Sequence, residues 1–451
     1  MFPKGFLSCI SKANGFDKAS FKQAHEFSPE SALRINPFKP IEKFNNEQKI
    51  PWASHAFYLA SRPDFVFDPF WHAGAYYVQE PSSMFLEHAL NFLNELPENV
   101  FALDLCGAPG GKSTILSSFI GENGILVSNE VVKQRAAILS ENIIKWNPQN
   151  TLVTNADPSR FSQLPNFFDL ILADVPCSGS GLFRKDPQAM NEWSQEQVAH
   201  CALRQRRIVA DCMDALNPGG YFIYSTCSYS EEENETNVDW MIAEFGLETV
   251  KVPVQPDWGI VVSVGEKYGA EGYRFYPGKA RGEGFFLCVL RKPNGEIRHR
   301  DRPEKKSLFQ PVKKNSDFYS KVSLGDWQEA TVFRDEILIL PRAFKNAIAS
   351  LSERLFVLHA GCKAGKLIHD EFIPDHALAM IPSLCSSYKS VHVSHEQAIR
   401  FLRKMDMKID FNVSGWNLVS YKNFNLGWIK GVGNRINNYY PRNFRILKAE
   451  D

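Results

Sequence analysis

Two cysteine residues stand in sequence contexts where a thiol could act as a nucleophile. Cys177 lies in Asp-Val-Pro-Cys-Ser-Gly-Ser-Gly, residues 174–181, and Cys227 lies in Tyr-Ser-Thr-Cys-Ser, residues 224–228. Each follows an expected strand among small or polar residues, so its sulfur can be exposed and a helix N-terminus can lower its pKa. Buried cysteines are usually inert apolar residues, and we interpret most of the others in that way: Cys9, Cys201, Cys212, Cys288, Cys362 and Cys385.

A glycine-rich segment at residues 104–114, Asp-Leu-Cys-Gly-Ala-Pro-Gly-Gly-Lys-Ser-Thr, lies between an expected strand and an expected helix. It differs from a nucleotide-binding P-loop, because Cys106 takes the place of an essential glycine and Pro109 lacks an N–H for phosphate. A loop for a nucleoside cofactor fits better. Its small residues let the backbone approach a ligand, and the helix that begins at Gly111 offers free N–H groups to a carboxylate.

Four acidic residues lie at the carboxyl ends of four successive expected strands: Asp104, Glu130, Asp157 and Asp174. The carboxyl ends of parallel strands share one edge of an open α/β sheet, and ligands bind at that edge. Glu130 could accept hydrogen bonds from both hydroxyl groups of a ribose, and Asp157 could accept one from an adenine amino group. A single Asp at a strand end is more often a helix cap, but four in order favour a binding site.

Short apolar runs and helical segments alternate from residue 101 to residue 290. We expect strands at residues 101–106, 124–130, 151–157, 168–174, 221–226 and 285–290. Helices are expected from residue 111, over residues 132–146, and along the apolar face formed by Val198, Ala202, Val209, Cys212, Met213 and Leu216. Ser230 and Glu233 have the spacing of a capping box that opens another helix. The alternation predicts an α/β fold with a parallel sheet covered by helices on both faces.

The segments on either side of this region have a different character. Residues 1–75 mix Pro, Asn and Phe with short charged stretches and predict a small N-terminal module. Residues 293–316 form a basic linker, and residues 317–451 are expected to fold separately as a mixed α/β or β-rich module. In residues 421–448, basic residues alternate with aromatic ones and no acidic residue occurs. This basic strip predicts either an RNA-binding surface or a small basic domain with buried aromatic residues.

The composition excludes several classes of protein. The 451 residues include 51 Lys and Arg against 51 Asp and Glu, and 44% are hydrophobic, as in a globular protein of two or three domains. No apolar run is long enough for a transmembrane helix, and residues 1–10 lack the apolar core of a signal peptide. The nine cysteines form no C-x-x-C pair. We therefore expect no disulfide framework, no metal site and a cytoplasmic location.

Three of these segments together resemble the Nop/Sun family of S-adenosylmethionine-dependent RNA cytosine-C5 methyltransferases. They are residues 104–112, 174–177 and 225–228, and the resemblance covers about residues 75–292. Two positions depart from the family pattern, which has Ala in place of Gly107 and of Val175; we expect such small changes to disturb little. Residues 426–441 resemble the PUA-like RNA-binding tail of a bacterial group of small-subunit ribosomal RNA methyltransferases.

The resemblance implies a fold and a set of site residues. The fold is a Rossmann-like class I methyltransferase sheet of seven strands, mainly parallel with one late antiparallel strand, in a catalytic domain of residues 76–292. An N-terminal RNA-binding module and a C-terminal PUA-like RNA-binding region flank it. Cys227 is the implied nucleophile, Cys177 assists product release, and Asp174 lies between cofactor and base. Glu130 is the implied residue at the ribose of S-adenosylmethionine, and Asp157 is the implied residue at its adenine. The other residues implied to hold this cofactor are Cys106, Gly107, Ala108, Pro109, Gly110, Gly111 and Lys112.

The implied reaction explains the need for two thiols. Cytosine C5 is too weak a nucleophile to take a methyl group until a thiolate adds at C6 and forms an enamine. The base must leave its stack for that attack, and hydrogen-bonding groups must meet the charge that develops at O2 and N3. Asp174 is the candidate for the N3/N4 edge, and Lys185 is either the group at O2 or an ordinary surface lysine. Cys177, or a water that it positions, would remove the C5 proton before Cys227 is expelled.

Three alternatives stay open at the level of the sequence. The implied substrate is small-subunit ribosomal RNA, and transfer RNA is the alternative. A DNA cytosine methyltransferase would use the thiol of Cys177 as its nucleophile and would need no thiol at Cys227. A non-catalytic RNA-binding scaffold would keep the fold without turnover, although the presence of all four acids and both thiols argues against it.

Overall fold

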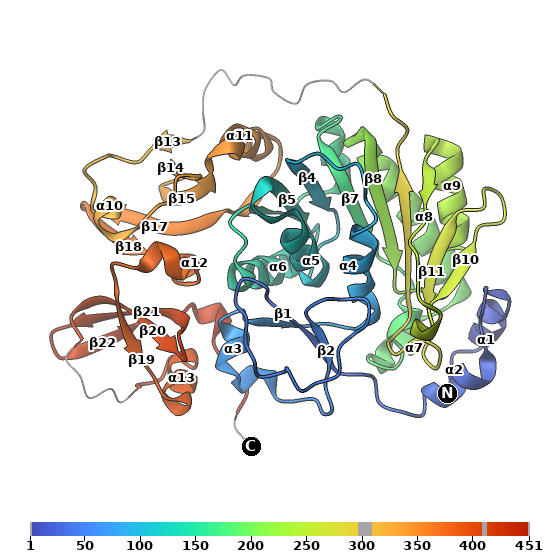
Figure 1. Ribbon diagram of the computed structural model, residues 1–451, viewed down its shortest axis with the longest axis horizontal. Coiled ribbons are helices and arrows are strands. Elements are labelled where there is room, and N and C mark those ends of the chain that lie inside the picture. The colour runs from blue at the N-terminus through green and yellow to red at the C-terminus, as the bar shows by residue number, and fades with distance from the viewer. Residues whose placement is uncertain (1, 296–308, 408–412, 450–451) are drawn as a thin grey trace.

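The computed structural model describes residues 2–295, 309–407 and 413–449. In Figure 1 a central sheet and its helices form the middle of the molecule, and the N-terminal strands lie along its lower edge. The C-terminal third of the chain, orange to red, forms two further sheets at one side. Most of the expected linker, residues 296–308, lies outside the described residues.

The central sheet contains ten strands within the described ranges, in the order β10-β11-β12-β8-β7-β4-β5-β6-β16, with β9 paired to β12. Strands β4 to β8 run parallel to one another, and β12 is antiparallel to β8. The predicted α/β fold with a late antiparallel strand is therefore confirmed. The expected count of seven strands was too low, because β9, β10 and β16 extend the sheet. The bounds are β4 Val100–Asp104, β5 Gly124–Asn129, β6 Thr151–Thr154, β7 Phe168–Asp174, β8 Leu216–Thr226, β9 Glu248–Val250, β10 Val261–Val264, β11 Glu271–Phe275, β12 Phe285–Arg291 and β16 Val357–Ala360.

The largest differences from the expected strand bounds are at the end of β6 and at the start of β8. Strand β6 ends at Thr154, three residues before Asp157. Strand β8 begins at Leu216, so that residues 217–220 lie within it although the Pro-Gly-Gly sequence predicted a break. A register shift between Phe168 and Leu170 of β7 accommodates this irregular segment.

Helices cover both faces of the central sheet and bury two apolar clusters against it. Helices α8 and α9 pack on one cluster, and α4 and α5 pack on the other. The predicted apolar face of α8 is buried from Val198 to Met213. Helix α9 begins after Asn234, so Ser230 and Glu233 do not form the expected capping box. The bounds are α4 Phe85–Leu90, α5 Gly111–Ile120, α6 Lys133–Trp146, α7 Pro187–Glu192, α8 Gln195–Met213 and α9 Glu235–Phe245.

The N-terminal part packs directly on the helix that follows the glycine-rich segment. Its buried Arg34 donates hydrogen bonds to Thr114 and to the Gly111 carbonyl (3.4 Å), and its guanidinium lies 4.6 Å from the ring centroid of Trp146. This part contains an antiparallel sheet in the order β2-β1-β3 and three short helices. The bounds are α1 Phe6–Cys9, α2 Lys18–Ala24, α3 Pro69–His72, β1 Ala32–Ile35, β2 Ala56–Tyr58 and β3 Tyr76–Val78.

The C-terminal part is joined to the central sheet by one of its strands. It forms the sheets β13-β14-β15-β17-β18 and β19-β20-β21-β22, but its strand β16 pairs antiparallel with β6. That pairing covers the backbone groups that β6 would otherwise leave open at the sheet edge. The other bounds are α10 Asp317–Lys321, α11 Lys345–Arg354, α12 His376–Ala379, α13 His395–Leu402, β13 Gln310–Pro311, β14 Gln328–Phe333, β15 Glu336–Pro341, β17 Cys362–Ile368, β18 Glu371–Pro374, β19 Lys389–His392, β20 Gly415–Tyr421, β21 Phe424–Val432 and β22 Arg435–Asn438.

Candidate active site

Two loops at the carboxyl edge of the central sheet bring together the two cysteines that the sequence singled out. Cys177 follows β7 and Cys227 follows β8, and their sulfur atoms lie 2.8 Å apart as free thiols. Backbone hydrogen bonds join the loops: the Gly181 N–H donates to the Cys227 carbonyl (2.7 Å), and the Val175 N–H donates to the Ser225 carbonyl (3.1 Å). Both cysteines are half-buried. The sheet topology alone therefore places two thiols from distant segments in contact.

The pKa of the Cys177 thiol is raised well above its ordinary value, first by its hydrogen bond with Cys227 and then by burial. The expectation that helix N-termini lower the pKa of this thiol is wrong. The nearby carboxylate of Glu233 raises it further, since a negative charge disfavours a second one. Cys177 therefore holds its proton near neutral pH and can donate it to the sulfur of Cys227.

An ion pair between Lys112 and Asp174 lies beside the cysteine loops. Lys112 Nζ is 2.8 Å from Asp174 Oδ2 and 5.0 Å from the ring centroid of Phe285. Ser225 Oγ donates to Asp174 Oδ1 (2.7 Å). Burial alone would lower the pKa of Lys112, but the charge and hydrogen bond of Asp174 act together with the nearby Asp104 and Cys227, so that this pKa is raised. Lys112 thus stays positively charged next to the predicted site.

Asp104 ends β4 and is completely buried within a hydrogen-bond network. Ser113 Oγ donates to Asp104 Oδ2 (2.6 Å) and lies 2.7 Å from Ser128 Oγ. Burial raises the pKa of Asp104 to about 7. Gly107 packs against the same network, and a Cβ atom at this position would lie 2.4 Å from Ser128 Oγ. Ala at position 107, the residue typical of the family pattern, would therefore not be a neutral change in this chain.

The backbone of the glycine-rich loop is held by side chains of helix α6. Arg135 donates to the Ala108 carbonyl (2.9 Å), and Asn142 donates to the Pro109 carbonyl (2.8 Å). Helix α5 then begins at Gly111 without a side-chain cap, since Gly110 occupies the N-cap with φ 119°. Its first N–H groups are consequently not claimed by a capping side chain.

Glu130 and Asp157 occupy different environments. Glu130 directly follows β5 and is buried, and its Oε1 accepts from the Val132 N–H (2.9 Å). Its Oε2 lies 3.2 Å from Arg135 Nη1 but without the alignment of a hydrogen bond. Asp157 is exposed and caps a short 3₁₀ helix, where hydrogen bonds from Ser159 lower its pKa. Lys185 is exposed at the surface.

The residues at this sheet edge fit a ligand that carries both a ribose and a carboxylate. Glu130 Oε2 is a buried acceptor without a hydrogen bond, at the strand end where ribose hydroxyl groups bind in open α/β sheets. The uncapped first turn of α5 can receive a carboxylate. S-adenosylmethionine has both groups, so the predicted cofactor-binding residues agree chemically with that molecule.

Glu233 is a site residue that sequence reasoning missed. It is completely buried, and its Oε1 accepts from the Ser178 N–H (2.8 Å) and from Gln205 Nε2 (3.1 Å). Its Oε2 accepts from the hydroxyl groups of Ser178 and Ser228. Burial raises the pKa of Glu233. The spacing from Ser230 indicated a local helix cap, whereas the true partners include a serine 55 residues away.

The C-terminal basic strip is only partly exposed. Three of its aromatic residues, Trp428, Tyr440 and Phe444, belong to the core, whereas Tyr439 is 44% exposed. This result favours the interpretation of a basic domain with buried aromatic residues for most of the strip. Several cations are nevertheless at the surface: Lys422, Arg435, Arg442 and Arg445.

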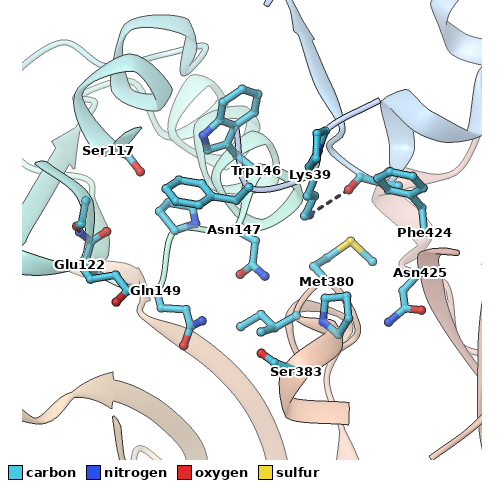
Figure 2. A pocket seen from close by; sticks show the side chains of 18 of the residues that line it. Lys39, Ser117, Glu122, Trp146, Asn147, Gln149, Met380, Ser383, Phe424 and Asn425 are labelled. Carbon is cyan, nitrogen blue, oxygen red and sulfur yellow. Dashed lines mark hydrogen bonds between the residues drawn. The ribbon is translucent and has the colours of Figure 1, made fainter. Parts of the chain in front are cut away.

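A cavity of about 450 Å³ lies where the N-terminal part, the end of α6 and the C-terminal part meet (Figure 2). Lys39 points into this junction and donates hydrogen bonds to the carbonyls of Ala73 (2.9 Å) and Lys145 (2.7 Å). Burial lowers the pKa of Lys39 to about 7. The described residues that line the cavity include none from the cysteine loops or the glycine-rich loop. It is therefore separate from the candidate active site.

Within the described ranges, membrane-spanning helices and clusters of three or more metal-ligating side chains are both absent. No helix there is long and apolar enough to cross a membrane. The same part of the chain contains no group of three or more His, Cys, Asp or Glu side chains that could hold a metal ion.

Three family models match successive parts of the chain. They are the N-terminal domain of 16S rRNA methyltransferase RsmF over residues 2–81, 16S rRNA methyltransferase RsmB/F over residues 91–291, and the methyltransferase RsmF PUA domain over residues 388–446. The middle match contains both cysteine loops and the glycine-rich loop.

Similar proteins extend over nearly the whole chain. Ribosomal RNA small subunit methyltransferase F from Aliivibrio salmonicida is 30% identical, covering 91% of this chain and 90% of the relative. The protein of that name from Aliivibrio fischeri (strain MJ11) is 29% identical over the same shares.

Two solved structures share the fold. A methyltransferase homologue from Pyrococcus horikoshii is 25% identical with a TM-score of 0.55, covering 64% of this chain and 95% of that chain. NSun6 from the same organism, with SFG, is 19% identical with a TM-score of 0.54. The match covers 65% of this chain and 99% of that chain.

Proposed function

We propose, from the premise that this chain belongs to the 16S rRNA methyltransferase RsmB/F family, that it methylates C5 of a cytosine in small-subunit ribosomal RNA. The family agrees with the Nop/Sun resemblance found in the sequence, and S-adenosylmethionine is its methyl donor. The observation that carries the proposal is the 2.8 Å contact between the sulfur atoms of Cys177 and Cys227. Methyl transfer to an oxygen or an exocyclic nitrogen needs no such pair of thiols, whereas C5 chemistry uses one thiol to add and one to release.

Cys227 is the nucleophile in this proposal. Cys177 keeps its proton and can donate a hydrogen bond to the sulfur of Cys227, which attacks as a thiolate once its own proton has passed to water. The thiolate adds to C6 of a flipped cytosine, and the new S–C6 bond leaves C5 nucleophilic. S-adenosylmethionine, when bound, supplies an electrophilic methyl group, and the residues proposed to hold it are 106–112, Glu130 and Asp157.

Asp174 and Lys112 orient the base. Both oxygen atoms of Asp174 already accept hydrogen bonds, but a carboxylate oxygen can accept a second one, here from the cytosine N4 amino group. The positive charge of Lys112, 2.8 Å from Asp174 Oδ2, adds to the field that meets negative charge developing on the ring.

Cys177 completes the reaction. Once Cys227 is bonded to C6, Cys177 has lost the hydrogen bond that is the largest cause of its raised pKa. Cys177 then passes its thiol proton to water, and the resulting thiolate takes the C5 proton, directly or through a water that it positions. The electron pair of the C5–H bond re-forms the C5–C6 double bond, and Cys227 leaves as a thiolate.

Separate Cys→Ala substitutions test the roles of the two thiols. We expect Cys227→Ala to abolish the covalent protein–RNA adduct, and Cys177→Ala to accumulate it, because only release is blocked. Denaturing gel electrophoresis with labelled ribosomal RNA measures the adduct, and Cys9→Ala, another half-buried thiol, is the control. Loss of the adduct in Cys177→Ala alone would reverse the assignment, as in a DNA cytosine methyltransferase.

The substrate is proposed from the relatives and from the flanking parts of the chain. We assign residues 76–292 to catalysis, and residues 1–75 and 317–451 to RNA contact, with exposed Arg435 and Arg442 as phosphate ligands. Bisulfite sequencing of total RNA, from cells with and without this protein, tests the assignment. A lost 5-methylcytosine in transfer RNA would replace the ribosomal substrate, and no lost site together with no S-adenosylmethionine binding would indicate a non-catalytic scaffold.

A further inference from the structure

One carboxylate contacts the residue that follows each thiol. Ser178 follows Cys177 and Ser228 follows Cys227, and both hydroxyl groups donate to Oε2 of Glu233. The N–H of Ser178 donates to Oε1 at 2.8 Å, and the two hydroxyl oxygens are 3.3 Å apart. The side chain of Glu233 therefore links the loop after β7 to the loop after β8.

The position of Glu233 is itself fixed by helix α8 and strand β8. Gln205 Nε2 donates both to Glu233 Oε1 and to the Pro176 carbonyl, each at 3.1 Å. Tyr224 donates its hydroxyl hydrogen to the Glu233 carbonyl at 2.6 Å. Glu233, Gln205 and Tyr224 all have 0% exposure. A buried polar network with its hydrogen bonds made is rigid, so Glu233 offers a fixed reference point for both loops.

The loop that carries Cys177 has a feature that makes such a tether useful. Gly179, two residues after the thiol, has φ 71°, and a Cβ atom there would meet nothing within 4 Å. Glycine in open space gives the backbone freedom to move. The three hydrogen bonds from Ser178 and Ser228 to Glu233 oppose that freedom.

We propose that Glu233 is a positioning residue that holds Cys177 and Cys227 at the separation needed for adduct formation and release. Its catalytic consequence rests on the proposed function, but its effect on the distance between the thiols does not. A buried carboxylate is costly unless hydrogen-bonded, and at this site its hydrogen bonds come from both cysteine loops and from α8.

The first test measures how fast the two thiols form a disulfide in the absence of RNA, a rate that depends on the distance between them. Diamide takes two electrons and two protons from two neighbouring thiols, which join as a disulfide. We expect Glu233→Ala to slow formation of the Cys177–Cys227 disulfide about 10-fold, because the loops separate. Mass spectrometry of tryptic peptides follows the product. The matched control is Glu232→Ala, an exposed acid in the same loop, which is expected to react like the wild type.

The second test measures turnover with ribosomal RNA. We expect Glu233→Ala to lower kcat about 100-fold, since displacement of reacting groups by about 1 Å costs that much, with S-adenosylmethionine affinity unchanged. Glu233→Gln is the conservative rescue, because its amide oxygen can accept from Ser178 N–H and its NH2 can donate to both hydroxyl groups. Glu233→Gln also removes the negative charge near Cys177, so iodoacetamide should alkylate Cys177 at a lower pH than in the wild type. A merely structural role of Glu233 would not produce this change in pH dependence.

The outcomes separate this inference from the proposed function. Wild-type cross-linking and turnover in Glu233→Ala would overturn the inference. Slow cross-linking in Glu233→Ala, combined with no Cys227-dependent RNA adduct in the wild type, would uphold it and reject the proposed function. If Glu233→Ala fails to fold, as judged by lost cofactor binding, Ser228→Ala removes a single hydrogen bond to the carboxylate and should slow cross-linking several-fold. An unchanged rate in Ser228→Ala would then overturn the inference.

Discussion

At the scale of single residues, Gly107 and Ser128 occupy complementary space beneath the glycine-rich loop. A Cβ atom at position 107 would meet Ser128 Oγ at 2.4 Å and Ser113 Oγ at 3.0 Å. We expect Gly107→Ala to destabilise the protein by about 1–3 kcal/mol, the usual effect of overpacking, and to weaken S-adenosylmethionine binding because the loop must shift. Urea denaturation and equilibrium binding measure the two effects.

A second substitution, at Ser128, tests whether contact with Ser128 Oγ causes the loss of stability in Gly107→Ala. Ser128→Ala removes the atom that the new Cβ would strike, so the double variant Gly107→Ala/Ser128→Ala should recover most of the loss, as a coupled pair does in a double-mutant cycle. Equal losses in the single and double variants would mean that the backbone of Gly107, rather than contact with Ser128, requires glycine.

Site residues could be predicted where chemistry and strand ends coincide in the sequence. Asp174 and Cys227 follow apolar runs, and each lies where a strand ends. The raised pKa of Cys177 could not be predicted, because it depends on a sulfur atom 50 residues away. Glu233 was misassigned for a related reason: a Ser-x-x-Glu spacing describes a helix cap, and the sequence contains no sign of the contact with Ser178.

At the scale of elements, the turn between β16 and β17 links the C-terminal part to the central sheet. Gly361 in this turn has φ 55°, and a Cβ atom there would lie 2.5 Å from the Ile339 carbonyl oxygen. We expect Gly361→Ala to lower the free energy of unfolding by about 1–3 kcal/mol in total. This loss is larger than the loss that the left-handed backbone conformation alone would cause. The free energy of unfolding from urea titration measures it.

A matched glycine isolates the contact from the backbone conformation. Gly433 has φ 57°, nearly that of Gly361, but a Cβ atom there would meet nothing within 4 Å. Gly433→Ala should therefore show the backbone cost alone. If both variants lose the same stability, the close approach to Ile339 has no energetic importance.

Most of the central sheet was predictable because its parallel strands are buried apolar runs between helices. Strand β16 was not, since its four residues pair with β6 about 200 residues earlier in the chain. The sequence around Val357 has no feature that specifies this partner. An edge strand added from a distant segment depends on tertiary packing, which periodicity does not describe.

At the scale of the whole molecule, three parts of the chain share one buried junction. His72 of the N-terminal part lies 3.1 Å from the hydroxyl of Tyr440 in the C-terminal part. His376 packs edge-on against the same Tyr440, with ring centroids 5.3 Å apart. Lys145 of α6 lies 4.4 Å from the ring centroid of Trp71. Both histidines are therefore held where a positive charge already exists and water is excluded.

This junction predicts that the protein loses stability in mild acid. Burial, then the charge of Lys145, lowers the pKa of His72 and of His376 to about 3 each, against 6.5 for an ordinary histidine. The folded state keeps both rings neutral, whereas the unfolded chain binds protons below pH 6.5. The two histidines therefore cost no stability above pH 6.5. As the pH drops from 6.5 toward 3, the free energy of unfolding decreases by up to about 1.4 kcal/mol per pH unit for each histidine.

Urea denaturation at pH 7, 6 and 5 tests this prediction, and the substitution of one histidine gives it residue-level resolution. His376→Leu removes one of the two groups, so the slope of unfolding free energy against pH below 6.5 should become shallower by about 1.4 kcal/mol per unit. The control is His392→Leu, because His392 is exposed on β19 and should leave the slope unchanged. Equal slopes in both variants would mean that the acid sensitivity arises elsewhere, with buried His359, whose pKa burial lowers to about 4, as the next group to replace.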